Sequence, residues 1–117
     1  MDARRLVRSF GFAASGIRYA LKYEQNMRIH LLAAVVVITA AFLTGLSVME
    51  WSIILLLIGG MLALEMINSA IERAVDLTMP DIHPLAKQAK DIAAGAVLVF
   101  AITSAIIGLL IFWPKWF

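Results

Sequence analysis

The chain has 117 residues, of which 62% are hydrophobic and 15% are charged, and its formal net charge is +2. Soluble domains are typically about 45–50% apolar and about 25% charged, so this composition excludes a soluble enzyme, a nucleic-acid-binding module and a disordered tail. The length corresponds to one domain, with room for about three membrane crossings of about 20 residues each. The sequence has no cysteine, which excludes a disulfide framework and thiolate chemistry.

The first predicted element is an amphipathic surface helix over residues 4–23. Apolar side chains recur at helical spacing and basic side chains occupy much of the remainder, a pattern suited to the headgroup plane of a bilayer. The apolar positions are Leu6, Phe10, Ala14, Ile17 and Leu21, and the basic positions are Arg4, Arg5, Arg8, Arg18 and Lys22. A soluble helix that packs on a partner is the alternative interpretation.

Three long apolar runs follow, and they predict an all-α integral membrane fold with three transmembrane helices. These helices are expected over about residues 29–46, 50–76 and 92–113. The third run contains 22 residues without a charge, whereas the second reaches its full length only if Glu65, Asn68 and Glu72 belong to its inner end. Residues 77–90 contain two prolines and are predicted to form a cytoplasmic loop between the last two spans.

The positions of the basic residues predict the orientation in the membrane. With three spans, nine of the 10 lysines and arginines fall on the side of the N-terminal helix and the 77–90 loop, and only Lys115 falls on the other. Cytoplasmic segments carry such an excess of positive charge, so the N-terminus is expected in the cytoplasm. Three tryptophans would form an aromatic belt at the outer interface: Trp51, Trp113 and Trp116.

Polar side chains mark the inner end of the second span. At about 100° per residue, four of them lie on one narrow stripe of a helix: Glu65, Asn68, Glu72 and Asp76. Glu65 would lie roughly 21 Å from Trp51, within a hydrocarbon core about 30 Å thick. A carboxylate there costs about 2.5–3.5 kcal/mol and usually faces a partner or a cavity. The stripe is therefore a candidate site, although Glu65 alone could join helices and Asp76 alone could solvate a helix end.

More charged side chains are expected on the same side of the membrane: Glu24, Asp81, Lys90 and Asp91. Such a group suits a magnesium-bound phosphate, because Mg²⁺ prefers one or two carboxylates together with phosphate oxygens. A lysine could steady a transferring phosphoryl group, and the deeper Glu65 could accept a hydroxyl proton. The spacing does not distinguish this site from a cation or proton relay. The P-loop and protein-kinase motifs are absent from the sequence.

The two histidines, His30 and His83, do not have the spacing of a zinc site. His30 is interpreted as an interface residue. His83 lies in a turn, where it could either contact a nucleotide or stabilise the turn itself.

Residues 65–72 (EMINSAIE), followed by Val75 and Asp76, resemble the E-x-x-N-[ST]-A-I-E-x-x-V-D signature of the small prokaryotic diacylglycerol kinase family. Residues 89–91 (AKD) match the second motif of that family. Residues 15–17 (SGI) and Glu24 match its N-terminal pattern. The resemblance covers essentially the whole chain.

Within this family, residues 26–30 (NMRIH) and 83–87 (HPLAK) resemble the Gram-positive branch, which is similar to undecaprenol kinases. The resemblance implies ATP- and Mg²⁺-dependent phosphorylation of undecaprenol, with diacylglycerol as the alternative acceptor. It also implies an oligomeric helical bundle, a homotrimer in which neighbouring subunits share each active site. Small side chains at positions 101, 105, 104 and 108 could permit close approach of helices.

The resemblance also implies roles for individual residues. Glu65 matches the general base that faces the lipid hydroxyl, and Asn68 matches a polar group of the catalytic site. Glu24 and Glu72 match the carboxylates that hold the Mg²⁺ of ATP. The residues expected to contact the nucleotide are Arg5, Glu24, Glu72, Asp76, Asp81, His83, Lys90 and Asp91.

Two other classes of function remain as alternatives. A small oligomeric transporter or channel subunit would line a pore with acids, but the outer half of the predicted bundle is apolar and only Glu50 lies near the outer surface. A structural membrane adaptor would leave the aligned acids unexplained. The favoured interpretation is a lipid kinase of the cell membrane, with its active site on the cytoplasmic side and a lipid alcohol, ATP and the bilayer as partners.

Overall fold

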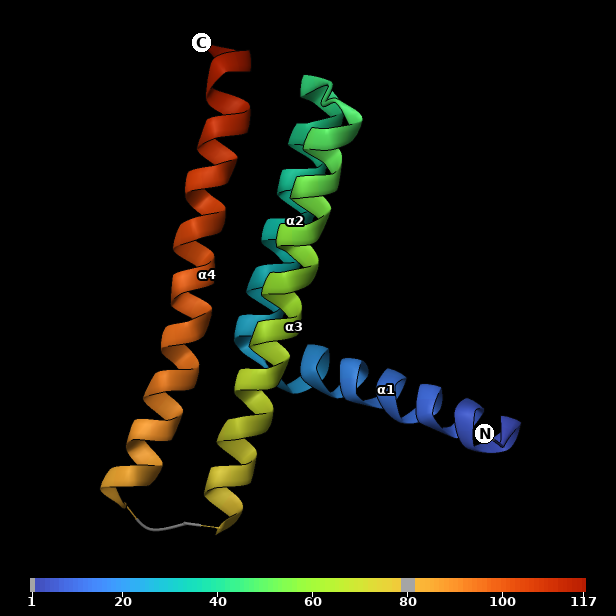
Figure 1. The fold of residues 1–117 in the computed structure, drawn as a ribbon, viewed down its shortest axis with the longest axis vertical. Helices are drawn as coiled ribbons and strands as arrows, with labels where there is room; N and C mark the ends of the chain where they lie inside the picture. Colours follow the sequence, from blue (N-terminus) through green and yellow to red (C-terminus); the bar gives the residue numbers. More distant parts are fainter. Residues whose placement is uncertain (1, 79–81) are drawn as a thin grey trace.

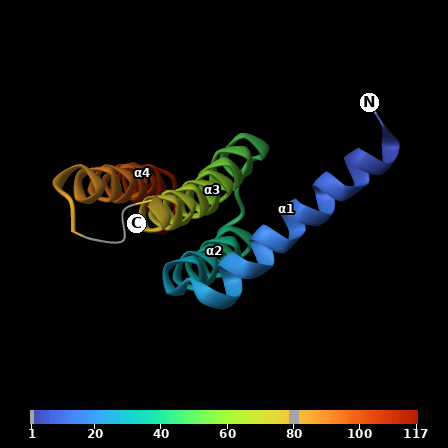
Figure 2. The ribbon, with the colours of Figure 1, turned by 90° about the horizontal axis from the view of Figure 1, so that it is seen from below.

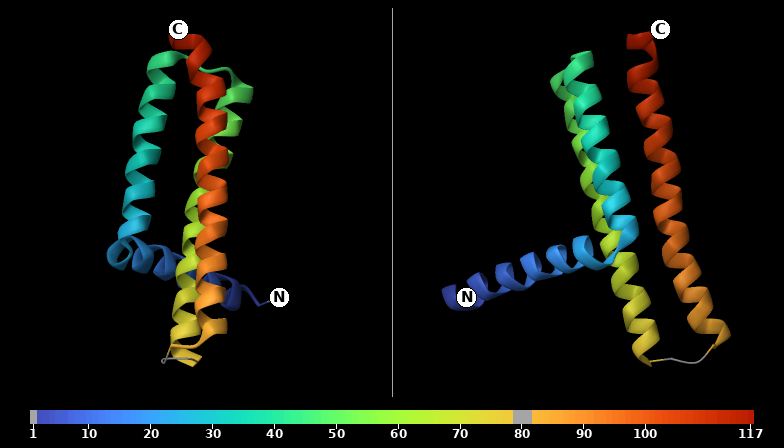
Figure 3. Two further views of the ribbon diagram at one scale, coloured as in Figure 1. Left: turned by 90° about the vertical axis from the view of Figure 1, so that its left-hand side faces the viewer. Right: turned by 180° about the vertical axis from the view of Figure 1, so that it is seen from behind.

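The computed structural model describes residues 2–78 and 82–117, and within these ranges the chain forms four helices (Figure 1). Their bounds are α1 Ala3–Tyr23, α2 Gln25–Thr44, α3 Val48–Thr78 and α4 Pro84–Trp116. Helices α2, α3 and α4 run side by side, and α1 projects from this bundle at a steep angle (Figures 1 and 3). The predicted all-α architecture is confirmed.

Three of the helices are long and apolar enough to cross a membrane: α2, α3 and α4. Helices α3 and α4 contain 31 and 33 residues, more than the roughly 20 that a hydrocarbon core requires. Both helices are therefore longer than the hydrocarbon core. At the end of the bundle where α3 connects to α4, the additional turns carry the charged residues.

The bend between α1 and α2 depends on one arginine. Only Glu24 separates the two helices. The Nη1 of Arg28 donates hydrogen bonds to the carbonyl oxygens of Leu21, at 3.2 Å, and Lys22, at 2.7 Å. The last carbonyls of a helix have no partner within the helix, so Arg28 satisfies the end of α1 and holds α1 against the start of α2.

The connection from α2 to α3 is a short turn at the other end of the bundle. Gly45 ends α2 with a φ of 80°, a left-handed conformation that favours glycine. Ser47 and Glu50 then form a reciprocal capping box. The Ser47 Oγ accepts from the Glu50 N–H at 3.1 Å, and the Glu50 Oε1 accepts from the Ser47 N–H at 3.0 Å.

The predicted loop over residues 77–90 is wrong at both of its ends. Helix α3 continues to Thr78, and α4 already begins at Pro84. Proline suits the first position of a helix because its fixed φ is helical and its missing N–H would have no partner there. The Nδ1 of His83 caps this helix by accepting from the Leu85 N–H at 3.1 Å. The second proline of the segment therefore starts a helix.

Helix α3 lies between α2 and α4 when the bundle is viewed along its length (Figure 2). Near the α2–α3 turn, Ala41, Ile54 and Phe112 belong to a buried apolar cluster. Towards the middle of the bundle, an apolar cavity of about 290 Å³ opens between the three helices. Ile54 and Phe112 of the cluster also line the cavity, so the packed cluster and the cavity adjoin each other. Beyond the cavity the interior becomes polar.

Gly60 of α3 leaves room for the ring of Phe100 of α4. A Cβ on Gly60 would lie 2.6 Å from the Cζ of Phe100, whereas a Cβ on the neighbouring Gly59 would meet nothing within 4 Å. We expect Gly60→Ala to destabilise the protein by about 1–3 kcal/mol, the usual cost of overpacking. Gly59→Ala is the matched control, and should be neutral or stabilise the helix by about 0.5–1 kcal/mol. Unfolding of both variants in the same detergent measures the difference, and equal stability would contradict the close packing.

Candidate active site

The stripe predicted on the second span lies on α3. Its first two residues, Glu65 and Asn68, face the inside of the bundle. Glu65 is 2% exposed and Asn68 is 7% exposed. One and two turns further along, Glu72 is half-buried and Asp76 is exposed. Ser69, which the sequence interpretation did not single out, is buried beside them. The stripe therefore passes from the apolar interior to the surface along a single helix.

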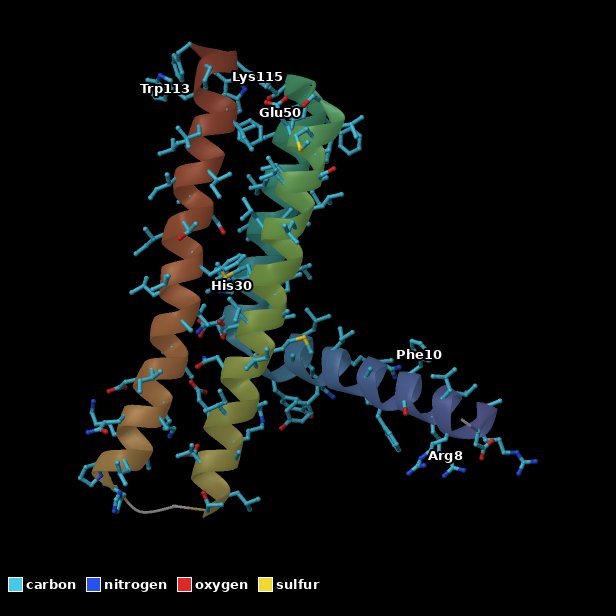
Figure 4. The ribbon with its side chains drawn as sticks, viewed as in Figure 1. Arg8, Phe10, His30, Glu50, Trp113 and Lys115 are labelled. Atoms are coloured by element: carbon cyan, nitrogen blue, oxygen red, sulfur yellow. The ribbon has the colours of Figure 1, made fainter. Side chains whose placement is uncertain are left out.

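The buried Glu65 is paired with a histidine from α2. The Nε2 of His30 lies 3.5 Å from the Oε2 of Glu65, and Figure 4 shows His30 within the bundle. The sequence interpretation of His30 as an interface residue missed this contact. A usable signal was present, because an ionisable residue in an apolar span needs a polar partner at a similar depth. His30 and Glu65 lie at similar depths in neighbouring antiparallel helices.

Asn68 and Glu72 occupy the next turn of α3. The Nδ2 of Asn68 donates a weak hydrogen bond to the Oε1 of Glu72 at 3.4 Å. The Oδ1 of Asn68 is buried and accepts no hydrogen bond from the described residues. A buried acceptor left without a donor costs about 1–3 kcal/mol, so this oxygen is available to a ligand of the site.

Glu24 reaches α3 through an arginine that the sequence analysis counted among the cytoplasmic positive charges but did not assign to the site. The Nη2 of Arg73 lies 2.5 Å from the Oε1 of Glu24. The Arg73 guanidinium also lies over the ring of Tyr19, 4.7 Å from its centre. These contacts join the bend between α1 and α2 to the residue that directly follows Glu72. The structure thus brings Glu24 to the site, but as the partner of Arg73.

Lys90 lies in the first turns of α4, before the uncharged stretch at 92–113. It contacts the stripe at its exposed end, where Asp76 lies. Its Nζ is 2.5 Å from the Oδ1 of Asp76. The hydrogen bond from Lys90 to Asp76 raises the pKa of the lysine, and the charges of Asp76 and Glu72 act in the same direction. The lysine therefore remains a cation at neutral pH, beside two carboxylates.

The remaining predicted nucleotide contacts are less close to this group. Asp91 pairs with Lys87 one turn away on α4, at 2.5 Å. His83 uses its Nδ1 to cap α4, which is the turn-stabilising alternative. Arg5 is exposed in the N-terminal part of α1, which points away from the bundle (Figure 1). Asp81 lies outside the described residues.

The chemistry of the site fits Mg²⁺ only in part. Within residues 2–78 and 82–117 of one chain, no group of three or more histidine, aspartate or glutamate side chains is placed to hold a metal ion. Glu72 and the free Oδ1 of Asn68 are oxygen ligands of the kind that Mg²⁺ accepts, and Mg²⁺ bound with a nucleotide needs only one or two carboxylates. Glu24 could join them once its carboxylate leaves Arg73.

Several known proteins that this chain resembles are named as lipid kinases. Residues 11–112 match the model of a family described as prokaryotic diacylglycerol kinase. An undecaprenol kinase of Bacillus subtilis is 54% identical over 114 residues, covering 97% of this chain and 93% of that protein. A diacylglycerol kinase of Synechocystis sp. is 44% identical over 107 residues, covering 91% of this chain and 61% of that protein. A diacylglycerol kinase of Escherichia coli is 26% identical over 109 residues, covering 93% and 89%.

Proposed function

The chain belongs to the prokaryotic diacylglycerol kinase family and is a lipid kinase, and we propose that it transfers a phosphoryl group from ATP to undecaprenol. The observation that carries the site assignment is the gradient of burial along α3. Glu65 is 2% exposed, whereas Asp76 is exposed and paired with Lys90. A hydroxyl group from the membrane and a phosphate from water can meet between these two depths. Diacylglycerol is the alternative acceptor.

In the proposed reaction the hydroxyl of the lipid attacks the γ-phosphorus of ATP. Glu65 accepts the hydroxyl proton. The free Oδ1 of Asn68 would serve beside Glu72 as an oxygen ligand of Mg²⁺ and so help to position the phosphates. Lys90 offsets negative charge on the phosphates, and this kind of positioning and charge neutralisation accounts for most catalysis of phosphoryl transfer. Glu72 and Glu24 would hold Mg²⁺, which when bound neutralises charge on the phosphate oxygens.

The apolar cavity gives the hydroxyl-bearing end of the lipid chain a place next to the base. His30 lines the cavity at one end, together with Ala34 from α2, Met61 from α3 and Ser104 from α4. Glu65 follows Met61 by one helical turn and touches His30. A chain lying in the cavity would therefore present its terminal hydroxyl to Glu65. The lining is almost wholly apolar, as an isoprenoid or acyl chain requires.

We also propose that α1 lies in the headgroup plane on the cytoplasmic side of the cell membrane. Phe10 and Arg8 point to opposite sides of α1 (Figure 4), and all side chains of its first half are exposed. Phe10 lies on the side from which the spans rise, so α1 can place apolar residues in the bilayer and arginines towards water. At the other end of the bundle, Trp113 and the Glu50–Lys115 pair would lie at the outer interface.

A homotrimer with shared active sites is part of the proposal. A single chain leaves many large apolar side chains exposed, among them Leu43 at 84% and Leu56 at 74%, which suits contacts with lipid and with other subunits. In one chain, Glu24 is paired with Arg73, and among the described residues no three side chains of the metal-binding kind come together. A neighbouring subunit that supplies part of the site would complete it.

The acceptor is tested by measuring kcat/KM for undecaprenol and diacylglycerol side by side, in the same mixed micelles with ATP and Mg²⁺. We expect undecaprenol to be preferred by at least about tenfold, which corresponds to about 1.4 kcal/mol of differential transition-state binding. A preference for diacylglycerol would assign the alternative acceptor. Phosphorylation of neither lipid would contradict the proposed function.

A further inference from the structure

Glu65 poses a problem of proton balance that the proposed function leaves open. If Glu65 takes the hydroxyl proton in each turnover, it must lose that proton before the next one. Its side chain is only 3% exposed, so bulk water does not reach it freely. A neighbouring group must therefore receive the proton. This inference rests on the proposed function, in which Glu65 is the base.

His30 is placed to receive it. Its Nε2 is 3.5 Å from the Oε2 of Glu65, and His30 lies on α2 two residues from Arg28, which is exposed at the start of that helix. Imidazole is the side chain that most readily gains and loses a proton near neutral pH. No other ion pair of Glu65 occurs among the described residues.

The other charged groups near this pair already have partners. On α2, Arg28 is bound to the last carbonyls of α1. On α3, Arg73 is paired with Glu24, and Glu72 accepts from Asn68. On α4, the polar side chain that lines the cavity with His30 is Ser104, which does not titrate, and Lys90 is bound to Asp76. Tyr19 of α1 lies under Arg73.

We propose that His30 is a positioning residue that relays the proton from Glu65 to water. As the bond between the lipid oxygen and the γ-phosphorus forms, the bond from phosphorus to the ADP oxygen breaks and ADP keeps that electron pair. The hydroxyl proton passes to Glu65, from the Glu65 carboxyl to the Nε2 of His30, and from the imidazolium to water. Both side chains then return to their starting protonation states. His30 lines the cavity proposed for the lipid chain, but it acts on the reaction through Glu65, which is the group that meets the reacting hydroxyl.

Chemical rescue tests the relay. We expect His30→Ala to lower kcat by about tenfold or more while the KM for ATP stays unchanged, since general acid–base groups contribute about 10²–10⁴-fold and His30 acts at one remove. Added imidazole should restore kcat in proportion to its concentration, because it can occupy the space vacated by the side chain. Imidazole should not restore Glu65→Gln, which is the matched control.

His30→Gln provides a second variant of similar size that cannot carry a proton. Its melting in detergent should match that of the wild-type protein, and its kcat should be low. An unchanged kcat in either variant would overturn the relay, and so would a low kcat in His30→Ala that imidazole does not raise, because that result means a structural role. If the wild-type protein phosphorylates no lipid alcohol, the proposed function fails. If the wild-type protein phosphorylates a lipid alcohol and the His30 variants keep the wild-type kcat, the relay fails and the proposed function stands.

Discussion

The Glu65→Gln variant is expected to fold normally and to lose about 10²- to 10⁴-fold in kcat, the range that a general base contributes. Glutamine has nearly the shape of glutamate, so the packing around this 2%-exposed side chain should survive. Glutamine cannot take a proton from the lipid hydroxyl. The KM values for ATP and lipid should change little, because the lost interaction acts in the transition state.

Initial rates at saturating ATP and lipid, together with both KM values, measure this effect. Glu50→Gln is the matched control, since it makes the same substitution at the other end of α3. Glu50 pairs with Lys115 at 3.1 Å, far along the helix from the stripe (Figure 4). The control should keep nearly normal turnover. A Glu65→Gln variant that also keeps it would remove Glu65 from the reaction.

The second large effect is expected for Glu72→Gln, through the metal ion. We expect the Mg²⁺ concentration for half-maximal activity to rise by at least about tenfold, because even the loss of a residue that only hydrogen-bonds to a metal ligand typically costs 10–100-fold in metal affinity. Glutamine removes the charge of Glu72 but preserves its size and its contact with Asn68. Glu24→Gln should shift the dependence in the same direction, with the added effect of releasing Arg73 from its partner.

A binding measurement separates this effect from turnover. Mn²⁺ can replace Mg²⁺ as a paramagnetic probe, and its binding in the presence of a non-hydrolysable ATP analogue can be followed without lipid. Weaker Mn²⁺ binding by Glu72→Gln than by Glu50→Gln is the expected result. Equal binding by the two variants, with superimposable Mg²⁺ curves, would exclude Glu72 as a metal ligand.

The features that the sequence predicted correctly depend on local pattern. The three spans follow from apolar runs longer than any soluble helix core requires. The alignment of Glu65, Asn68 and Glu72 follows from helical spacing alone. The start of α4 was mispredicted because proline favours both a turn and the first position of a helix. His83 as its cap would have resolved that ambiguity.

The contacts that were missed join residues from different helices. Glu65 meets His30 only because α2 and α3 run antiparallel with a particular offset. Glu24 meets Arg73 because the chain bends between α1 and α2, where Arg28 binds the last carbonyls of α1. The spacing of residues along one helix predicts neither of these two distances between helices. The sequence therefore identified the residues of the candidate site that lie on α3, and the structure identified the residues of α2 and of the α1–α2 bend that contact them.

The central claim is that the polar stripe of α3 is where ATP phosphorylates a membrane alcohol. The most direct test measures transfer of the labelled γ-phosphoryl group of ATP to undecaprenol in micelles. The wild-type protein and the double variant Glu65→Gln/Glu72→Gln are compared at equal amounts of folded protein. The account predicts label in undecaprenyl phosphate for the wild-type protein and background for the double variant. Nearly normal transfer by the double variant would contradict it.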